Sequence, residues 1–175
     1  MVSDESKKER LVFSLQFLVM KTELIVVGKT VNKHFIACID DYVGRINHYM
    51  PFSMTVIPEL KNTKGITTEQ QKTMEGELIM KRLQPSDNVV LLDERGKELT
   101  SKQMAAWLEQ KQQTARRLVF VVGGPYGFSQ EVYDRANEMI SLSRMTFSHQ
   151  MVRLIFTEQL YRACTIIKGE PYHHE

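Results

Sequence analysis

The fold is decided by Leu-Val-Phe-Val-Val (118–122), followed at once by Gly-Gly-Pro-Tyr-Gly (123–127). An unbroken apolar run of this kind is typical of a strand buried on both faces of a parallel sheet. Glycines directly after such a strand allow the backbone to approach a ligand closely. They match neither the dinucleotide-binding pattern nor a Walker loop, so a plain tight turn is the alternative. The stretch therefore predicts an α/β fold with either a ligand site or a bare turn where this strand ends.

Strand-like and helix-like segments alternate along the rest of the chain. Strands are expected at 23–28, 54–57, 88–92 and 118–122, and a fifth short strand or an extended loop at 140–147. Helices are expected at 35–49, from a capping box at Thr68 to 83, from a cap at Ser101 to 108, after a cap at Ser129, and from Ser148 to Lys168. Strict alternation predicts a mainly parallel sheet with helices on both faces. In such sheets ligands bind beyond the carboxyl ends of the strands, so the loops at 93–96, 123–127 and 143–147 are expected to line one crevice.

Composition and charge exclude some classes of protein. A chain of 175 residues with 42% hydrophobic and 25% charged residues is long enough for one globular domain with its own core. The net charge is only +2, so any basic surface must be local. Local basic clusters, such as Lys61 with Lys64 and Arg116 with Arg117, are either such a surface or a solvated face. No bulk positive charge is therefore available to drive nucleic-acid binding.

The cysteines and histidines predict no metal site. Cys38 and Cys164 lie far apart, outside any metal-ligand spacing, and in apolar helical patterns. They are expected to be buried, reduced thiols, as in a cytoplasmic protein. Only His173 and His174 adjoin in the sequence, and adjacent side chains point apart, so a zinc site is not expected.

The first residues only faintly imitate a signal peptide. A charged segment at 7–10 precedes an apolar run at 11–19, but acidic residues interrupt the charges and no small-residue cleavage site follows. The run is too short to span a bilayer, and no membrane partner is expected. We expect residues 1–19 to be an extension outside the fold, and residues 20–175 to form a single domain.

The last helix is apolar on more than one side. Its apolar residues are Met151, Val152, Leu154, Ile155, Phe156, Leu160, Ala163, Ile166 and Ile167. Such a helix must be covered on most sides. A second subunit in a two-fold dimer would provide that cover, and so would a central position inside the monomer. Glu158 and Arg162 are spaced as a favourable pair on the same helix.

Segments from the whole chain carry a family resemblance. They are Val-Val-Gly-Lys (26–29), Lys-Asn-Thr-Lys (61–64), Met-Glu-Gly-Glu (74–77), Leu-Leu-Asp-Glu-Arg-Gly-Lys (91–97), Val-Gly-Gly-Pro-Tyr-Gly (122–127), Leu-Ser-Arg-Met-Thr-Phe-Ser-His-Gln-Met-Val-Arg (142–153), Glu-Gln-Leu-Tyr-Arg-Ala (158–163) and Pro-Tyr-His-His-Glu (171–175). Together they resemble the bacterial large-subunit ribosomal RNA methyltransferase H family of the SPOUT superfamily. The likeness runs from Met20 to Glu175.

The resemblance implies a SPOUT-type fold with a C-terminal trefoil knot, and an obligate homodimer. It implies S-adenosylmethionine as the methyl donor, and N3 of a pseudouridine in the 23S rRNA of the assembled 70S ribosome as the acceptor. The family's cofactor positions map onto Leu92, Gly123, Gly124, Leu142, Ser143, Arg144, Met145, Thr146 and Phe147. A sulfonium donor carries its own electrophilic methyl group, so no metal is required.

Methylation of the acceptor requires a group that removes a proton from it or favours the loss of that proton. The imide N3 must lose its proton, which a nearby base or a cationic hydrogen-bond donor would favour. Arg153, His149, Tyr172 and His173 are the expected catalytic residues, with Tyr161 and Arg162 as further candidates. Two other functions stay open: a non-catalytic RNA-binding ribosome-assembly factor, and a SPOUT methyltransferase acting on another RNA.

Overall fold

A computed structural model describes residues 19–174, so the expected extension lies outside the described residues except for Val19. The strands are β1 (Lys21–Val27), β2 (Phe52–Ile57), β3 (Asn88–Glu98), β4 (Arg117–Val122) and β5 (Glu138–Ser141), and the helices are α2 (Lys33–Ile46), α3 (Thr68–Met80), α4 (Ser101–Thr114), α5 (Gln130–Arg135) and α6 (Met151–Ile167). The five strands form one sheet in the order β2-β1-β4-β3-β5, and every neighbouring pair is parallel. The predicted α/β fold with a parallel sheet is confirmed.

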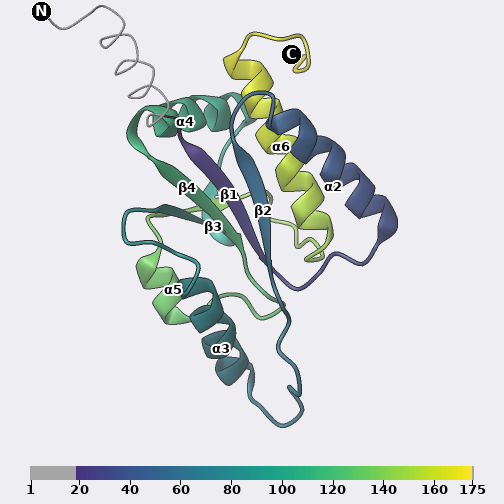
Figure 1. Ribbon diagram of the computed structural model, residues 1–175, viewed down its shortest axis with the longest axis vertical. Coiled ribbons are helices and arrows are strands. Elements are labelled where there is room, and N and C mark those ends of the chain that lie inside the picture. The colour runs from purple at the N-terminus through teal and green to yellow at the C-terminus, as the bar shows by residue number, and fades with distance from the viewer. Residues whose placement is uncertain (1–18, 175) are drawn as a thin grey trace, which may run out of the picture.

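The sheet is covered on both faces (Figure 1). Alternate side chains of the central strand β4 point to opposite layers. Leu118 and Phe120 pack with residues of α2, α4 and α6, whereas Val119 and Val121 pack with residues of α3 and α5. A strand with apolar partners on both sides requires an unbroken apolar sequence, which explains the 118–122 run.

Several helix boundaries differ from those expected. Helix α3 is capped by Thr67 rather than Thr68, because the Thr67 hydroxyl and the Gln70 side chain exchange hydrogen bonds with each other's backbone amides. Helix α4 is capped by Thr100 in the same way and continues to Thr114, beyond the expected end at Leu108. Helix α2 ends at Ile46, before the turn that leads to Pro51.

Strand β3 was expected to end at Leu92, and this is wrong. The strand continues to Glu98, with a register shift in which Leu92 and Lys97 both pair with Ile140 of β5. The intervening residues 93–96 form a bulge, and a Cβ atom added to Gly96 would lie 2.6 Å from the backbone of Ile140. Strand β5 itself ends at Ser141, so most of the expected strand at 140–147 is an irregular segment.

Helix α6 packs between α2 and α4 on one face of the sheet. It begins at Met151 rather than at Ser148, although the Ser148 hydroxyl accepts a hydrogen bond from the Met151 amide at 3.2 Å. Its outward side chains are half-buried in the single chain. Gly169, at a φ of 69°, ends the helix as expected. The trefoil knot implied by the resemblance stays a prediction.

The two cysteines lie in different environments. Cys164 on α6 is buried, and burial raises the pKa of its thiol to about 12. Cys38 on α2 is exposed, so the expectation of two buried thiols is wrong for this residue. The buried stripe of α2 runs through Ile39 and Ile46, and Cys38 lies beside it. Within residues 19–174, no helix has the length and apolar character needed to cross a membrane.

Candidate active site

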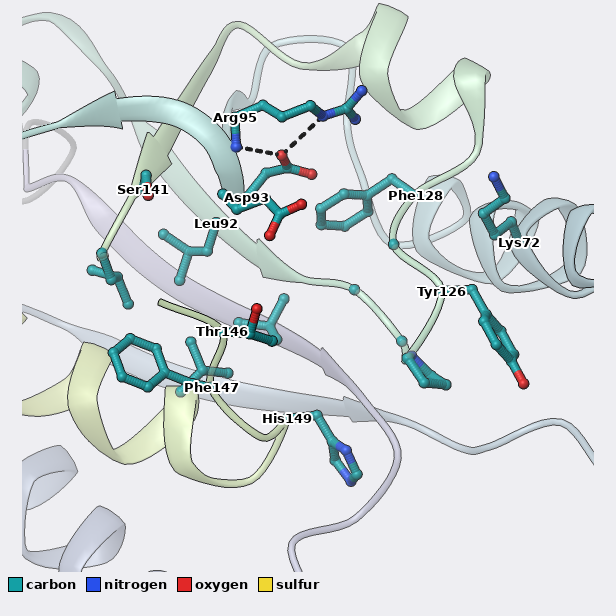
Figure 2. A pocket seen from close by; sticks show the side chains of 18 of the residues that line it. Lys72, Leu92, Asp93, Arg95, Tyr126, Phe128, Ser141, Thr146, Phe147 and His149 are labelled. Carbon is teal, nitrogen blue, oxygen red and sulfur yellow. Dashed lines mark hydrogen bonds and ion pairs between the residues drawn. The ribbon is translucent and has the colours of Figure 1, made fainter. Parts of the chain in front are cut away.

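A cavity of about 900 Å³ opens beside the bulge of β3, where β4 and β5 end. Its walls come from α3 and α5, from residues 92–95 within β3, from the glycine turn after β4, and from the segment that joins β5 to α6. Figure 2 shows Thr146 and Phe147 on one side, and Tyr126 and Phe128 on the other. The three loops expected to share one crevice therefore do so, at the edge of the sheet where parallel α/β proteins bind ligands.

The turn after β4 is built from bare backbone. The Gly127 amide donates to the Gly124 carbonyl at 3.1 Å, and Gly127 has a φ of 82°, which a residue with a side chain rarely adopts. A Cβ atom on Gly123 would lie 3.1 Å from the Phe128 ring. That ring packs edge-on against Tyr133 at 5.6 Å between centroids, so the turn is held from behind by aromatic side chains.

The segment after β5 is fixed by its own serines. The Ser141 hydroxyl donates to the Ser143 carbonyl at 3.0 Å, and the Met145 amide donates to the Ser143 hydroxyl at 2.9 Å. Met145 is 77% exposed, and it lines the cavity together with Thr146. A wall with exposed apolar side chains and local hydrogen bonds can receive a flat apolar ligand group.

Asp93 is the best-connected charged group of the cavity. Its carboxylate accepts hydrogen bonds from the Tyr133 hydroxyl at 2.6 Å, and from the backbone and Nε of Arg95 at 2.9 and 3.2 Å. The Arg95 guanidinium also stacks over the Tyr133 ring at 4.4 Å. Burial opposes ionisation of Asp93, but these hydrogen bonds prevail and lower its pKa. Burial and the same carboxylate raise the pKa of Tyr133.

The expected cofactor positions come together in space. Leu92, Gly123, Gly124, Leu142, Ser143, Met145, Thr146 and Phe147 all line the cavity. Arg144 does not, because its side chain turns to solvent and its Nε lies 3.2 Å from Glu98. The positions expected from the resemblance thus line one cavity, apart from Arg144, and their role in binding the cofactor stays a prediction.

The expected catalytic residues are divided between three places. His149 lines the cavity, just before α6. Arg153 is fully buried, and it donates to the Val27 carbonyl at 2.6 Å and to the Thr30 hydroxyl at 2.9 Å. Burial lowers the pKa of its guanidinium. Arg153 therefore ties the start of α6 to the loop after β1 and does not line the cavity within one chain.

Tyr172 and His173 lie on a tail that folds back along α6. The Tyr172 hydroxyl lies 3.1 Å from the Glu158 carboxylate and 3.4 Å from the Tyr42 hydroxyl, and burial and these neighbours raise its pKa. His173 Nδ1 lies 3.4 Å from the Arg162 guanidinium, which forms the expected pair with Glu158 at 2.5 Å. Neither tail residue lines the cavity of its own chain.

Sequence reasoning missed the wall contributed by α3 and α5. Lys72 of α3 and Tyr133 of α5 both line the cavity. The available signal was Gly76, since a Cβ atom there would collide with the Ser129 side chain that caps α5. A glycine inside a helix usually marks such a close approach, and this one brings α3 next to the glycine turn.

Comparison with known proteins adds the family. Residues 20–173 match the family described as "Predicted SPOUT methyltransferase". The chain belongs to the SPOUT methyltransferase family. Proteins named ribosomal RNA large subunit methyltransferase H are 64% identical in Bacteroides fragilis, 62% in Phocaeicola vulgatus and 54% in Porphyromonas gingivalis. Each alignment covers 157 residues, which is 89% of this chain and 100% of the relative.

Membership in this family means that the chain uses a methyl donor. Among residues 19–174, no group of three or more His, Cys, Asp or Glu side chains is arranged to hold a metal ion.

Proposed function

We propose that this chain transfers a methyl group from S-adenosylmethionine to N3 of a pseudouridine in 23S rRNA of the assembled ribosome. The observation that carries the proposal is a match, over 89% of this chain, to the whole length of proteins named ribosomal RNA large subunit methyltransferase H. The cavity supports it, because the positions that the family uses for its donor lie together on the walls.

The cavity fits the proposed donor in size and in lining. About 900 Å³ is within the range of pockets that enclose a ligand of this size. The Gly123-Gly124 backbone offers hydrogen-bonding groups without side chains in front of them, and Leu92, Leu142 and Phe147 offer apolar surface for an adenine ring. When bound, the donor supplies a methyl group already activated by a sulfonium, so the protein needs only to bind and orient it.

The acceptor must lose the proton on N3 as the new N–C bond forms and the S–C bond breaks. His149 lines the cavity and is our choice for the group that takes or orients this proton. Asp93 is less suited, since its carboxylate is already engaged by Tyr133 and Arg95. Arg153 contributes as a positioning residue, because it fixes the first turn of α6 next to His149.

We propose that a second copy completes the site. Leu154, Ile155 and Ile166 of α6 are apolar and only half-buried in one chain, which favours cover by a partner in a two-fold dimer. Tyr172 and His173 lie away from the cavity of their own chain. In the dimer, the tail of one protomer serves the cavity of the other.

The deciding experiment is mass spectrometry of 23S rRNA from a strain that lacks the gene, with and without a plasmid that restores it. Loss and return of one N3-methylated pseudouridine would support the proposal. Unchanged 23S rRNA together with a lost methyl group in another RNA would identify a different acceptor. Calorimetry with S-adenosylmethionine separates a non-catalytic assembly factor, which would release no heat.

A further inference from the structure

A buried carboxylate lies directly behind the glycine turn of the cavity. Glu75, on α3, is only 3% exposed. Its Oε1 accepts one hydrogen bond from the Gln71 side chain at 2.9 Å, and its Oε2 has no hydrogen-bond partner among the described residues. No Lys or Arg in that part of the chain forms an ion pair with it. An ionised carboxylate without a cation is costly to bury, so this position needs an explanation.

The carboxylate is separated from the cavity by a single glycine. A Cβ atom added to Gly124 would lie 2.9 Å from the carboxylate carbon of Glu75. Gly124 lines the cavity, whereas Glu75 does not. Gly76, the next residue of α3, allows the helix to lie close to the cap of α5. The two glycines together bring the charge of Glu75 as near to the cavity as backbone thickness permits.

Other acidic groups around the cavity are compensated or screened. Glu69 pairs with Lys72 at 2.5 Å, and Asp93 pairs with Arg95 at 3.2 Å. Glu94 is exposed, so solvent and salt screen its charge. Glu75 is therefore a buried carboxylate near the cavity that has no cationic partner among the described residues, and a cationic ligand in the cavity would supply one.

We propose that Glu75 determines specificity for a cationic methyl donor over its neutral product. This rests on the proposed function. During transfer the methyl carbon leaves the sulfur, the sulfonium becomes a neutral thioether, and the N3 proton passes to a base. S-Adenosylhomocysteine therefore carries one positive charge less than S-adenosylmethionine. A fixed buried carboxylate attracts the cationic donor more strongly than the product, which lacks the sulfonium charge. Because this attraction disappears after methyl transfer, product release is assisted.

The test compares wild-type protein with Glu75→Gln by calorimetry. The substitution keeps the shape and removes the charge. We expect the Kd for S-adenosylmethionine to rise about tenfold, because the substitution removes an opposite charge several ångströms from the sulfonium. The Kd for S-adenosylhomocysteine, which lacks the sulfonium charge, should change less than about twofold. The Kd for sinefungin, in which a protonated amine replaces the sulfonium, should rise by about the same factor as the Kd for the donor. Glu77→Gln, an exposed position on the same helix, is the matched control and should change neither Kd.

Thermal unfolding of the ligand-free protein gives a second readout. Removal of an uncompensated buried charge should leave the Tm of Glu75→Gln unchanged or higher. A purely structural role predicts the opposite pattern, namely a lower Tm with both ligands weakened equally, and that result would overturn the proposal. If Glu75→Gln fails to fold, Glu75→Asp takes its place, because it retains the carboxylate. The ratio of the two Kd values should then stay within about threefold of the wild-type ratio. A larger change would overturn the proposal that Glu75 selects the cationic donor.

The two proposals fail in distinguishable ways. If wild-type protein binds neither ligand, the proposed function is wrong and the role of Glu75 falls with it. If wild-type protein binds both ligands and Glu75→Gln weakens both to the same extent, the methyltransferase assignment stands and only the charge-selection proposal is overturned.

Discussion

Gly124 has the cavity on one side and the Glu75 carboxylate on the other. A Cβ atom at this position would collide with that carboxylate, so we expect Gly124→Ala to displace either the turn or the Glu75 side chain of α3. Overpacking of this kind costs about 1–3 kcal/mol, and donor affinity should fall by about tenfold or more, since the displaced turn is part of the proposed donor site. Calorimetry and thermal unfolding measure both effects.

The matched control is Gly44→Ala. Gly44 lies on α2, and nothing lies within 4 Å of a Cβ atom added there. Alanine in a helix interior is favoured over glycine by about 0.5–1 kcal/mol, so this variant should be slightly more stable and should bind the donor normally. Equal donor affinity in Gly124→Ala and Gly44→Ala would show that the turn does not contact the donor.

The hydrogen bond between Tyr133 and Asp93 predicts a pH dependence of stability. Folding lowers the pKa of Asp93 from its ordinary 3.8 and raises that of Tyr133 from its ordinary 10.0. The contribution of Asp93 is therefore present above pH 3.8 and is lost as the pH falls through the lowered value. That of Tyr133 is present below pH 10 and is lost above the raised value. Tyr133→Phe should cost about 1 kcal/mol at pH 7 and progressively less below pH 3.8.

Urea unfolding at pH 7 and pH 3 measures this difference. Tyr126→Phe is the control, because Tyr126 is 51% exposed and its hydroxyl has no hydrogen-bond partner among residues 19–174. A penalty for Tyr133→Phe that is the same at both pH values would mean that the hydroxyl stabilises the fold independently of the charge on Asp93, which would contradict the prediction.

At the scale of elements, the bulge in β3 holds β5 close to β3 beside the cavity. Gly96 lies against the backbone of Ile140, and β5 leads directly into the segment that carries Leu142 and Phe147. Gly96→Ala should push β5 away from β3, with a loss of about 1–3 kcal/mol of stability and a weaker donor complex. Hydrogen exchange should report faster opening of β5 amides while β1 amides are unchanged; equal protection of β5 in variant and wild type would contradict this.

The same bulge shows where sequence reasoning reached its limit. The core strand at 118–122 was predictable because both of its faces are buried, which leaves a direct pattern in the sequence. Residues 93–96 have the composition of a turn, and their extension of β3 depends on pairing with Ile140, a contact distant in sequence. The caps at Thr67 and Thr100 were missed by one residue because Thr68 and Ser101 are equally plausible caps in the sequence.

At the scale of the whole molecule, nearness in sequence was a poor guide to nearness in space. Arg153 is four residues from His149, yet it is buried against the loop after β1. Nothing in the sequence of α6 indicates that Arg153 contacts the loop after β1. Figure 1 shows α6 running from the edge where the strands end back toward the edge where they begin, and the C-terminal end lies beyond it. The tail is thereby led away from the cavity of its own chain.

A tail that serves the partner's cavity makes a quantitative prediction. A protomer truncated after residue 170 should keep its donor affinity but lose methylation. A full-length protomer with Gly124→Ala should have a weakened donor site of its own, inactive at donor concentrations well below its raised Kd, but keep a working tail. In dimers formed by random pairing after co-expression, half are mixed, and each mixed dimer has one complete site. The unseparated mixture should regain about a quarter of wild-type activity, and mixed dimers purified through a different tag on each protomer about half, measured as methyl incorporation into ribosomes from a strain lacking the gene. If the tail works within its own chain, every mixed dimer lacks a complete site and the mixture stays inactive.

If size-exclusion chromatography with light scattering gives the mass of one chain, the shared site is excluded before any activity is measured.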